Sequence, residues 1–179
     1  SMPHTSYDLC DIENPQTHKM IFDILDKTPR AVKVKYPESM VPLAFILFFL
    51  NEQQKLFETV GEIFEVVGES KLSQHEKNRI LGETELLVSF SEFNDIAKMS
   101  AHHKRAYQLL GTKASLINMK STWSFGSPSV MCLYHSHSGE LDKELSLMDE
   151  CMPCYYKLTG GHGSGSEYAM RAEAELLHG

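Results

Sequence analysis

Three segments of this chain carry apolar residues in one shared helical register, and this repeat limits the possible folds more than any other feature of the sequence. The apolar stripes begin at positions 56, 96 and 141, offsets of 40 and 45 residues, and another apolar residue stands eight positions before each start. A period of this length is typical of stacked helical hairpins, which make binding surfaces, rather than of a compact enzyme domain. We therefore predict an all-α fold of tetratricopeptide-like helical hairpin repeats forming a superhelical array. The matching residues are Phe48, Leu56, Val60, Ile63 and Val67; Val88, Ile96, Ser100, His103 and Tyr107; and Leu133, Leu141, Leu145, Met148 and Met152.

Composition and charge argue against a nucleic-acid-binding surface. The 179-residue chain is 42% hydrophobic and 23% charged, as soluble folded proteins are. Its formal net charge of −7 at pH 7 opposes contact with phosphates, which clustered Lys and Arg would have to neutralise. The only basic run, at 102–105, is short and falls inside a predicted helix. We expect no direct contact between this segment and nucleic acid.

The chain carries no sign of export or of membrane insertion. Residues 1–13 have neither a charged nor an apolar signal region, and we assign them to an N-terminal tail whose Ser-Met start resembles a cloning remnant. The apolar run at 41–50 has only ten residues, too few to span a bilayer, and it predicts a buried helix. Four cysteines are few for a disulfide scaffold of this size. A cytoplasmic protein is expected, with residues 14–179 forming one helical-repeat sensor or interaction domain that belongs to a longer protein.

Capping signals divide residues 14–179 into successive helices. Asn14-Pro15 and Thr28-Pro29 each combine an N-cap residue with a proline at the first helical position. Ser73 and Glu76 form a capping box, and Asn94 is the predicted N-cap of a helix that Gly111 closes. The remaining expected helices cover about 40–50, 52–67, 128–139, 140–158 and 166–177, and the 52–67 helix places Leu56, Val60, Ile63, Phe64 and Val67 on one face.

Two cysteine-containing patterns carry a chemical hypothesis and a plain alternative. Cys151 and Cys154 match a C-x-x-C pattern, but redox chemistry requires the first thiolate at a helix N-terminus after a strand, and this pair falls late in a helix. Two structural thiols are the alternative. Together with His135 and His137 the same cysteines offer zinc-ligand types, although two histidines two residues apart diverge on a helix. We predict neither a metal site nor a cofactor in this segment, and no catalytic residue, because no Ser-His-Asp order, paired carboxylates or H-E-x-x-H occurs.

Two irregular stretches are the candidate binding sites. Residues 112–127 lack periodicity and contain Trp123, the only tryptophan, near Phe125; aromatic residues on such a loop suit stacking on a ligand or peptide, or they fill a gap between repeats. The glycine-rich stretch 160–165 leads into a helix. It lacks the preceding strand and the lysine of nucleotide motifs, so it predicts a flexible connection that could still contact a carboxylate or phosphate. We select Trp123, Phe125, His162 and Tyr168 as ligand- or partner-binding residues.

Three stretches of the chain resemble a known family. They are YPESMVPLAFILFFLNEQQKLF, ILGETELLVSFSEFNDIAKMSAHHKRAYQLL, and STWSFGSPSVMCLYHSHSGELDKE with YYKLTGGHGSGSEY. From about residue 28 to the end, the chain is similar to the helical-repeat region of MalT-type, LuxR-family bacterial transcription regulators. In that family an ATPase module precedes the repeats and a helix-turn-helix follows them. This chain contains neither a G-x-x-x-x-G-K-[ST] motif nor a basic recognition helix.

The resemblance implies a non-enzymatic, effector-sensing or protein-interaction segment of such a regulator, with the ATPase and DNA-binding modules outside this chain. Its partners would be a small-molecule effector or a regulatory protein, with no membrane contact and possible self-association. A general tetratricopeptide-type peptide-binding scaffold is the alternative.

Overall fold

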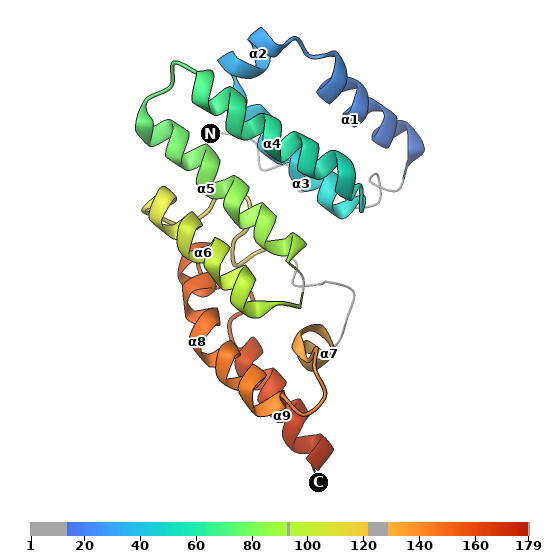
Figure 1. Cartoon of the computed structure of the whole chain (residues 1–179), viewed down its shortest axis with the longest axis vertical. Coiled ribbons are helices and arrows are strands. Elements are labelled where there is room, and N and C mark those ends of the chain that lie inside the picture. The colour runs from blue at the N-terminus through green and yellow to red at the C-terminus, as the bar shows by residue number, and fades with distance from the viewer. Residues whose placement is uncertain (1–13, 93, 122–128, 179) are drawn as a thin grey trace. The chain divides into compact units, whose positions relative to one another are not determined.

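The regular structure of the chain is helical throughout the part that the structure describes. The computed structural model describes residues 14–92, 94–121 and 129–178, and no strand occurs among them. These residues form two compact units, Ser1–Ile80 and Leu81–Gly179, and the division falls within one helix (Figure 1). The predicted all-α class is therefore confirmed. The elements are α1 (Pro15–Lys27), α2 (Arg30–Lys35), the 3-10 turn η2 (Pro37–Ser39), α3 (Met40–Phe49), α4 (Gln53–Glu69), α5 (Gln74–Ser91), α6 (Ile96–Leu110), α7 (Val130–Tyr134), α8 (Leu141–Thr159) and α9 (Ser166–His178).

The starts of α1 and α5 follow the capping chemistry that the sequence predicts. The Asn14 side chain accepts a hydrogen bond from the Gln16 amide at 2.9 Å, and Pro15, which directly follows Asn14, is the first residue of α1. The Glu76 carboxylate of α5 accepts from the Ser73 amide at 2.8 Å, as a capping box requires. Thr28 has a different role from the predicted one. Its hydroxyl donates to the Ile24 carbonyl at 2.5 Å and so ends α1 instead of capping α2.

Two other helix starts differ from the prediction. The N-cap of α6 is Asp95, whose carboxylate accepts from the Lys98 amide at 3.0 Å, while Asn94 before it adopts a positive φ of 66°. Asparagine tolerates this left-handed conformation, so it turns the chain into the helix and does not cap it. The helix expected to reach residue 139 ends at Tyr134, and its N-cap is Ser129.

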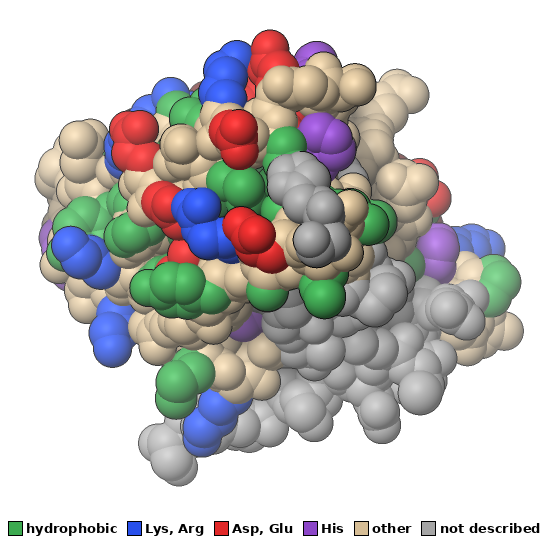
Figure 2. Space-filling view, turned by 90° about the horizontal axis from the view of Figure 1, so that it is seen from below, with side chains coloured by type: hydrophobic (Ala, Val, Ile, Leu, Met, Phe, Trp, Pro, Cys, Tyr) green, Lys and Arg blue, Asp and Glu red, His purple; other side chains and the backbone are tan. Residues whose placement is uncertain are grey.

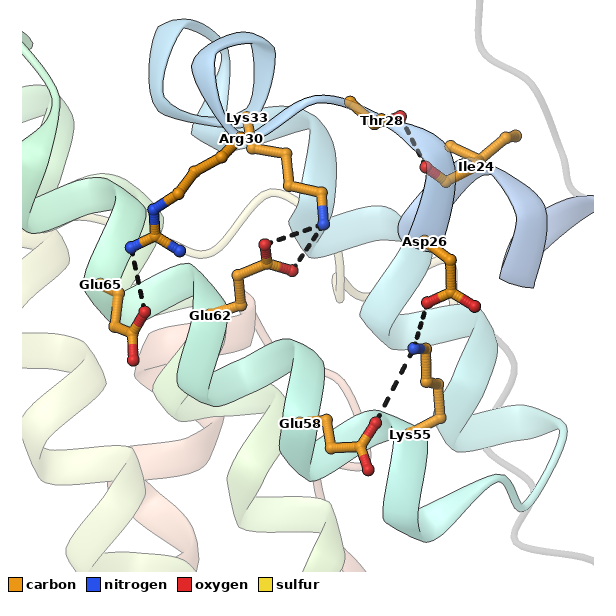
Figure 3. Close-up of polar contacts among 9 residues, drawn as sticks. All are labelled: Ile24, Asp26, Thr28, Arg30, Lys33, Lys55, Glu58, Glu62 and Glu65. Atoms are coloured by element: carbon orange, nitrogen blue, oxygen red, sulfur yellow. Dashed lines mark hydrogen bonds and ion pairs between the residues drawn. The ribbon is translucent and has the colours of Figure 1, made fainter.

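The first unit packs α3 against α4, with α2 laid across one side of α4. Ion pairs join α2 to α4 (Figure 3). Arg30 lies 3.0 Å from Glu65, and the buried ammonium of Lys33 contacts both oxygens of Glu62 at 2.7 and 2.8 Å. The glutamates that take part in ion pairs form an acidic face of α4, which consists of Glu58, Glu62, Glu65 and Glu69.

The core face of α4 is narrower than the sequence pattern predicts. Leu56, Val60, Ile63 and Val67 are buried, but Phe64 remains 43% exposed. Phe64 therefore does not belong to the core of this unit, contrary to the sequence-based expectation.

The second unit packs α8 against both α6 and α9, and α9 also contacts α7. The predicted stripe of α6 is confirmed: Ile96, Met99, His103, Ala106 and Leu110 are all buried. Two of the positions shared by α4, α6 and α8 are not buried: Tyr107 is 43% exposed, and Leu141 is only partly buried. Within the described residues, none of the helices has the length and hydropathy needed to cross a membrane.

Candidate functional site

A glutamate of α5 fixes the start of the long irregular segment after α6. The buried carboxylate of Glu83 accepts hydrogen bonds from the Ser115 amide at 2.5 Å and from the Ser115 hydroxyl at 2.7 Å. One residue earlier, the Ala114 amide donates to the Leu158 carbonyl of α8 at 2.7 Å. Hydrogen bonds that an ionised carboxylate accepts from backbone N–H groups are among the stronger hydrogen bonds in proteins. The chain is thus tied to α5 and α8 directly after it leaves α6.

A second glutamate, on α9, fixes the other end of this segment. Glu173 accepts from the Ser129 hydroxyl at 2.9 Å and from the Met131 amide at 2.7 Å. A helix N-terminus has free N–H groups and a positive dipole end, so a carboxylate placed there stabilises it. Glu173 therefore supplies a cap for α7 from another helix. Trp123 and Phe125 belong to the stretch between the two anchored ends and lie outside the described residues.

A third glutamate, Glu144 of α8, holds the turn after α7. Its buried carboxylate accepts from the amides of Ser136 at 3.0 Å and His137 at 3.1 Å, and it contacts the His135 ring. Burial alone would raise the pKa of Glu144, but these hydrogen bonds stabilise the charged form and lower the pKa to about 2. Glu144 is therefore ionised at neutral pH, and both oxygens of its carboxylate accept hydrogen bonds from groups of this chain.

The glycine-rich turn between α8 and α9 is tightly hydrogen-bonded. Four glycines of this turn have positive φ: Gly160, Gly161, Gly163 and Gly165. Glycine adopts this backbone conformation readily, so the conformation of the turn accounts for the glycines and no bound ligand is needed to explain them. Two adjacent tyrosines of α8 hold the turn from one side. The Tyr155 hydroxyl lies 2.6 Å from Nδ1 of His162, and the Tyr156 hydroxyl lies 2.9 Å from that of Ser166 and donates to Glu167.

Burial and the Glu167 contact raise the pKa of Tyr156 to about 12, so its hydroxyl keeps its proton at neutral pH. It can thus donate to the Glu167 carboxylate throughout the physiological range.

The Tyr155 ring links this turn to α6. The ring centres of Tyr155 and His103 are 4.8 Å apart, and Nε2 of His103 lies 3.1 Å from the Ser89 hydroxyl of α5. Burial raises the pKa of Tyr155 and lowers the pKa of His103 to about 3, so both groups are neutral at physiological pH. A continuous contact path therefore runs from Ser89 through His103 and Tyr155 to His162.

His162 and Tyr168, the two predicted binding residues that the structure describes, do not share one surface. His162 is buried, with 5% of its surface exposed, and contacts Tyr155. Tyr168 lies in the first turns of α9 and is 72% exposed. Burial makes His162 a residue that positions the turn, while Tyr168 is accessible to a partner.

The cysteine and histidine patterns do not form a reactive or metal-binding cluster. Cys151 is buried in α8, and burial raises the pKa of the Cys154 thiol, the opposite of what a reactive thiolate needs. His135 and His137 face Glu144. Among the described residues, no three His, Cys, Asp or Glu side chains are placed to hold a metal ion.

The first unit has a shallow, mainly apolar hollow of about 560 Å³ along α1. Neither His162 nor Tyr168 lines it; its described lining is Gln16, Lys19, Met20, Asp23, Ile24, Lys27, Thr28 and Pro29. Elsewhere, Figure 2 shows acidic, basic and apolar side chains intermixed on the face that it views.

Sequence analysis missed the three glutamates, although two of them carried a signal. Glu83 precedes Leu86 and Leu87 by three and four positions, and Glu144 lies between Leu141 and Met148 on the same side of α8. A charged residue on an apolar helix face needs a buried partner, so both could have been marked as anchors. The partner of Glu83 could not have been named, because Ser115 lies 32 residues away in the sequence. The partners of Glu144 are only seven to nine residues away, but they lie in a turn for which the sequence predicts a helix.

Comparisons with protein-family models, with curated proteins and with solved structures find no match for this chain.

Proposed function

We propose that this chain is a non-enzymatic, effector-sensing or protein-interaction segment of a LuxR-family transcription regulator of the MalT type, with ATPase and DNA-binding modules in parts of the protein outside this chain. In this proposal its helical hairpins stack as tetratricopeptide-like repeats. The observation that carries it is the anchoring of one irregular segment at both ends, by Glu83 of α5 and by Glu173 of α9. Irregular segments held on a rigid helical scaffold commonly bind ligands.

The anchors also supply a mechanism for signalling. A ligand that binds between the two ends and favours a different path of the segment would change the Glu83 and Glu173 contacts. A movement of α9 would then also change the α8–α9 turn, because Glu167 of α9 accepts a hydrogen bond from Tyr156 of α8. A ligand shifts such an equilibrium only by the difference in its affinity for the two arrangements. In the proposed signalling mechanism, the effector binds non-covalently.

Each predicted binding residue has a distinct role in this proposal. Trp123 and Phe125 contact the effector, and Tyr168, exposed on α9, contacts the effector or a partner protein. His162 acts indirectly: through its hydrogen bond with Tyr155 it positions the turn from which α9 starts.

The proposal is tested in the complete regulator, whose reading frame must encode a P-loop before this segment and a helix-turn-helix after it. In a promoter-reporter strain, Trp123→Ala should abolish induction without lowering the melting temperature of the segment. Leu176→Ala, which alters an 82% exposed residue of α9, is the control and should induce normally. A reading frame lacking both modules would overturn the proposal in favour of a general peptide-binding scaffold.

A further inference from the structure

Helix α4 has a third face besides its core face and its acidic face. At 100° per residue, the positions i, i+4, i+7 and i+11 from residue 57 lie on one side of a helix. We call this side the outer face. All of its residues are exposed and uncharged; they are Gln53, Gln54, Phe57, Gly61, Phe64 and Gly68. Phe57 is 52% exposed and Phe64 is 43% exposed.

The two glycines of the outer face have no structural reason within the chain. A Cβ atom added to Gly61 or Gly68 would meet nothing within 4 Å, and neither residue has a positive φ. Glycine inside a helix costs about 1 kcal/mol relative to alanine. The outer face thus pairs two exposed aromatic rings with two open gaps at which another backbone can approach closely.

The order of these residues is complementary to itself when the helix is reversed. The spacing of Phe57, Gly61, Phe64 and Gly68 is four, three and four residues, which is the same in both directions. In an antiparallel pair of α4 helices related by a two-fold axis, Phe57 of one copy faces Gly68 of the other, and Phe64 faces Gly61. Every ring then meets a gap, whereas a parallel pair would set ring against ring. We propose that the outer face of α4 binds a second copy of this chain in this antiparallel arrangement.

Charge and area limit this homodimer to a low affinity. The chain carries a formal net charge of −7, so two copies repel one another, and the outer face is a side of α4 without charge. A half-exposed phenylalanine offers about 100 Å² to a partner, so four rings contribute about 400 Å². Stable interfaces bury about 1,600 Å² in total. Association through α4 is therefore expected to be weak and to appear only at high protein concentration.

Sedimentation over a wide range of protein concentration tests this proposal. The weight-average mass should rise with concentration from 20.3 kDa towards twice that value. Phe64→Gln and Gly61→Gln should each keep the chain monomeric without lowering the melting temperature of the monomer, because both positions are exposed. Gly61→Gln should raise that temperature slightly, because it replaces a glycine inside a helix. Leu176→Gln on α9 is the matched control and should dimerise like the wild type. A chain that is monomeric at every concentration, or variants that dimerise normally, would overturn the proposal.

Disulfide trapping tests the antiparallel arrangement separately. Chains carrying Phe57→Cys, mixed under mild oxidation with tagged chains carrying Gly68→Cys, should accumulate the mixed covalent dimer, because the disulfide traps the transient encounters that remain when one ring is lost. Neither variant alone should cross-link above the background that the four native cysteines give in the wild type. Two copies of position 57 would lie about 16 Å apart along the helix axes, too far for a disulfide. Efficient cross-linking of Phe57→Cys with itself would contradict the two-fold arrangement.

Discussion

At the scale of single residues, His103 shows how burial fixes a protonation state. The Ser89 hydroxyl donates its only proton to the Leu86 carbonyl at 2.6 Å, so its oxygen must accept from Nε2–H of His103. Nδ1 of His103 is then unprotonated, and it is buried with no hydrogen-bond partner among the described residues. A proton added there would place an unpaired charge in the core. This cost is the reason why the pKa of His103 falls to about 3.

The free energy of unfolding should therefore decrease as the pH falls below 6.5. Between the unfolded pKa of 6.5 and the folded pKa of about 3, the unfolded chain binds a proton at His103 and the folded chain does not. At pH 5 the loss should be about 2 kcal/mol relative to neutral pH. Urea unfolding at several pH values measures it. Glu144, with a pKa lowered from 4.5 to about 2, adds its own loss only below pH 4.5.

His103→Gln should remove most of the pH dependence between 5 and 7. His75→Gln, which alters an exposed histidine of α5, should leave it unchanged. An equal slope in wild type and His103→Gln would show that His103 is not the group that titrates.

Two glycines give opposite expectations for the same substitution. A Cβ atom on Gly82 would lie 2.6 Å from Cγ of Leu110 and 3.2 Å from the Ala106 carbonyl, whereas one on Gly61 meets open space. Gly82→Ala should therefore lower the free energy of unfolding by about 1–3 kcal/mol. Gly61→Ala should raise it by about 0.5–1 kcal/mol, measured at concentrations where the chain is monomeric. If Gly82→Ala proves neutral, α5 and α6 do not approach as closely as described.

At the scale of elements, short helix α7 depends on another helix for its stability. It has only five residues, too few to be stable alone, and Glu173 of α9 accepts from its Met131 amide. A local N-cap, the Ser129 hydroxyl, donates to Glu173 and accepts from the Cys132 amide at 3.0 Å. The stability of α7, at the end of the candidate binding segment, therefore depends on its hydrogen bonds with Glu173 of α9.

Glu173→Gln should loosen α7 while the helices around it stay folded. Loss of the charged acceptor should cost about 1–3 kcal/mol. Hydrogen exchange should become faster at the amides of Val130 and Met131. Glu175→Gln, an exposed substitution on the same helix, is the control. Unchanged exchange in Glu173→Gln would show that the anchor does not stabilise α7.

The elements also show what the sequence could and could not predict. Local rules placed α1, α5 and α6 well, because N-caps, a capping box and the Gly111 C-cap act over a few residues. They failed where a contact is distant: Glu173 reaches Met131 across 42 residues, and no local pattern marks such a pair. They also misplaced Phe64, because periodicity assigns a stripe to one face but does not say where the packing partner stops. The sequence predicts His162 as a binding residue from its position in an irregular turn, and only the structure identifies Tyr155 as its partner.

At the scale of the whole molecule, the sequence pattern and the structure agree that the described residues are all-α, and within each unit neighbouring helices pack against one another. The apolar positions of α4, α6 and α8 are mostly buried, as expected for elements that each need neighbours to cover them. In the proposed function, effector binding at the segment around Trp123 changes the contacts of that segment with α5 and α9, and no reaction is catalysed.

The most direct test uses Trp123, the only tryptophan of the chain, as a fluorescent reporter of that segment. A panel of small metabolites is titrated one at a time, and each mixture is afterwards analysed by mass spectrometry. We predict that one chemical class shifts the Trp123 emission saturably and is recovered unchanged, and that Phe125→Ala abolishes the shift while Cys132→Ser, at an exposed residue of α7, preserves it. Conversion of a compound into a product, at a rate unaffected by Phe125→Ala, would contradict the proposal that this chain senses and does not catalyse.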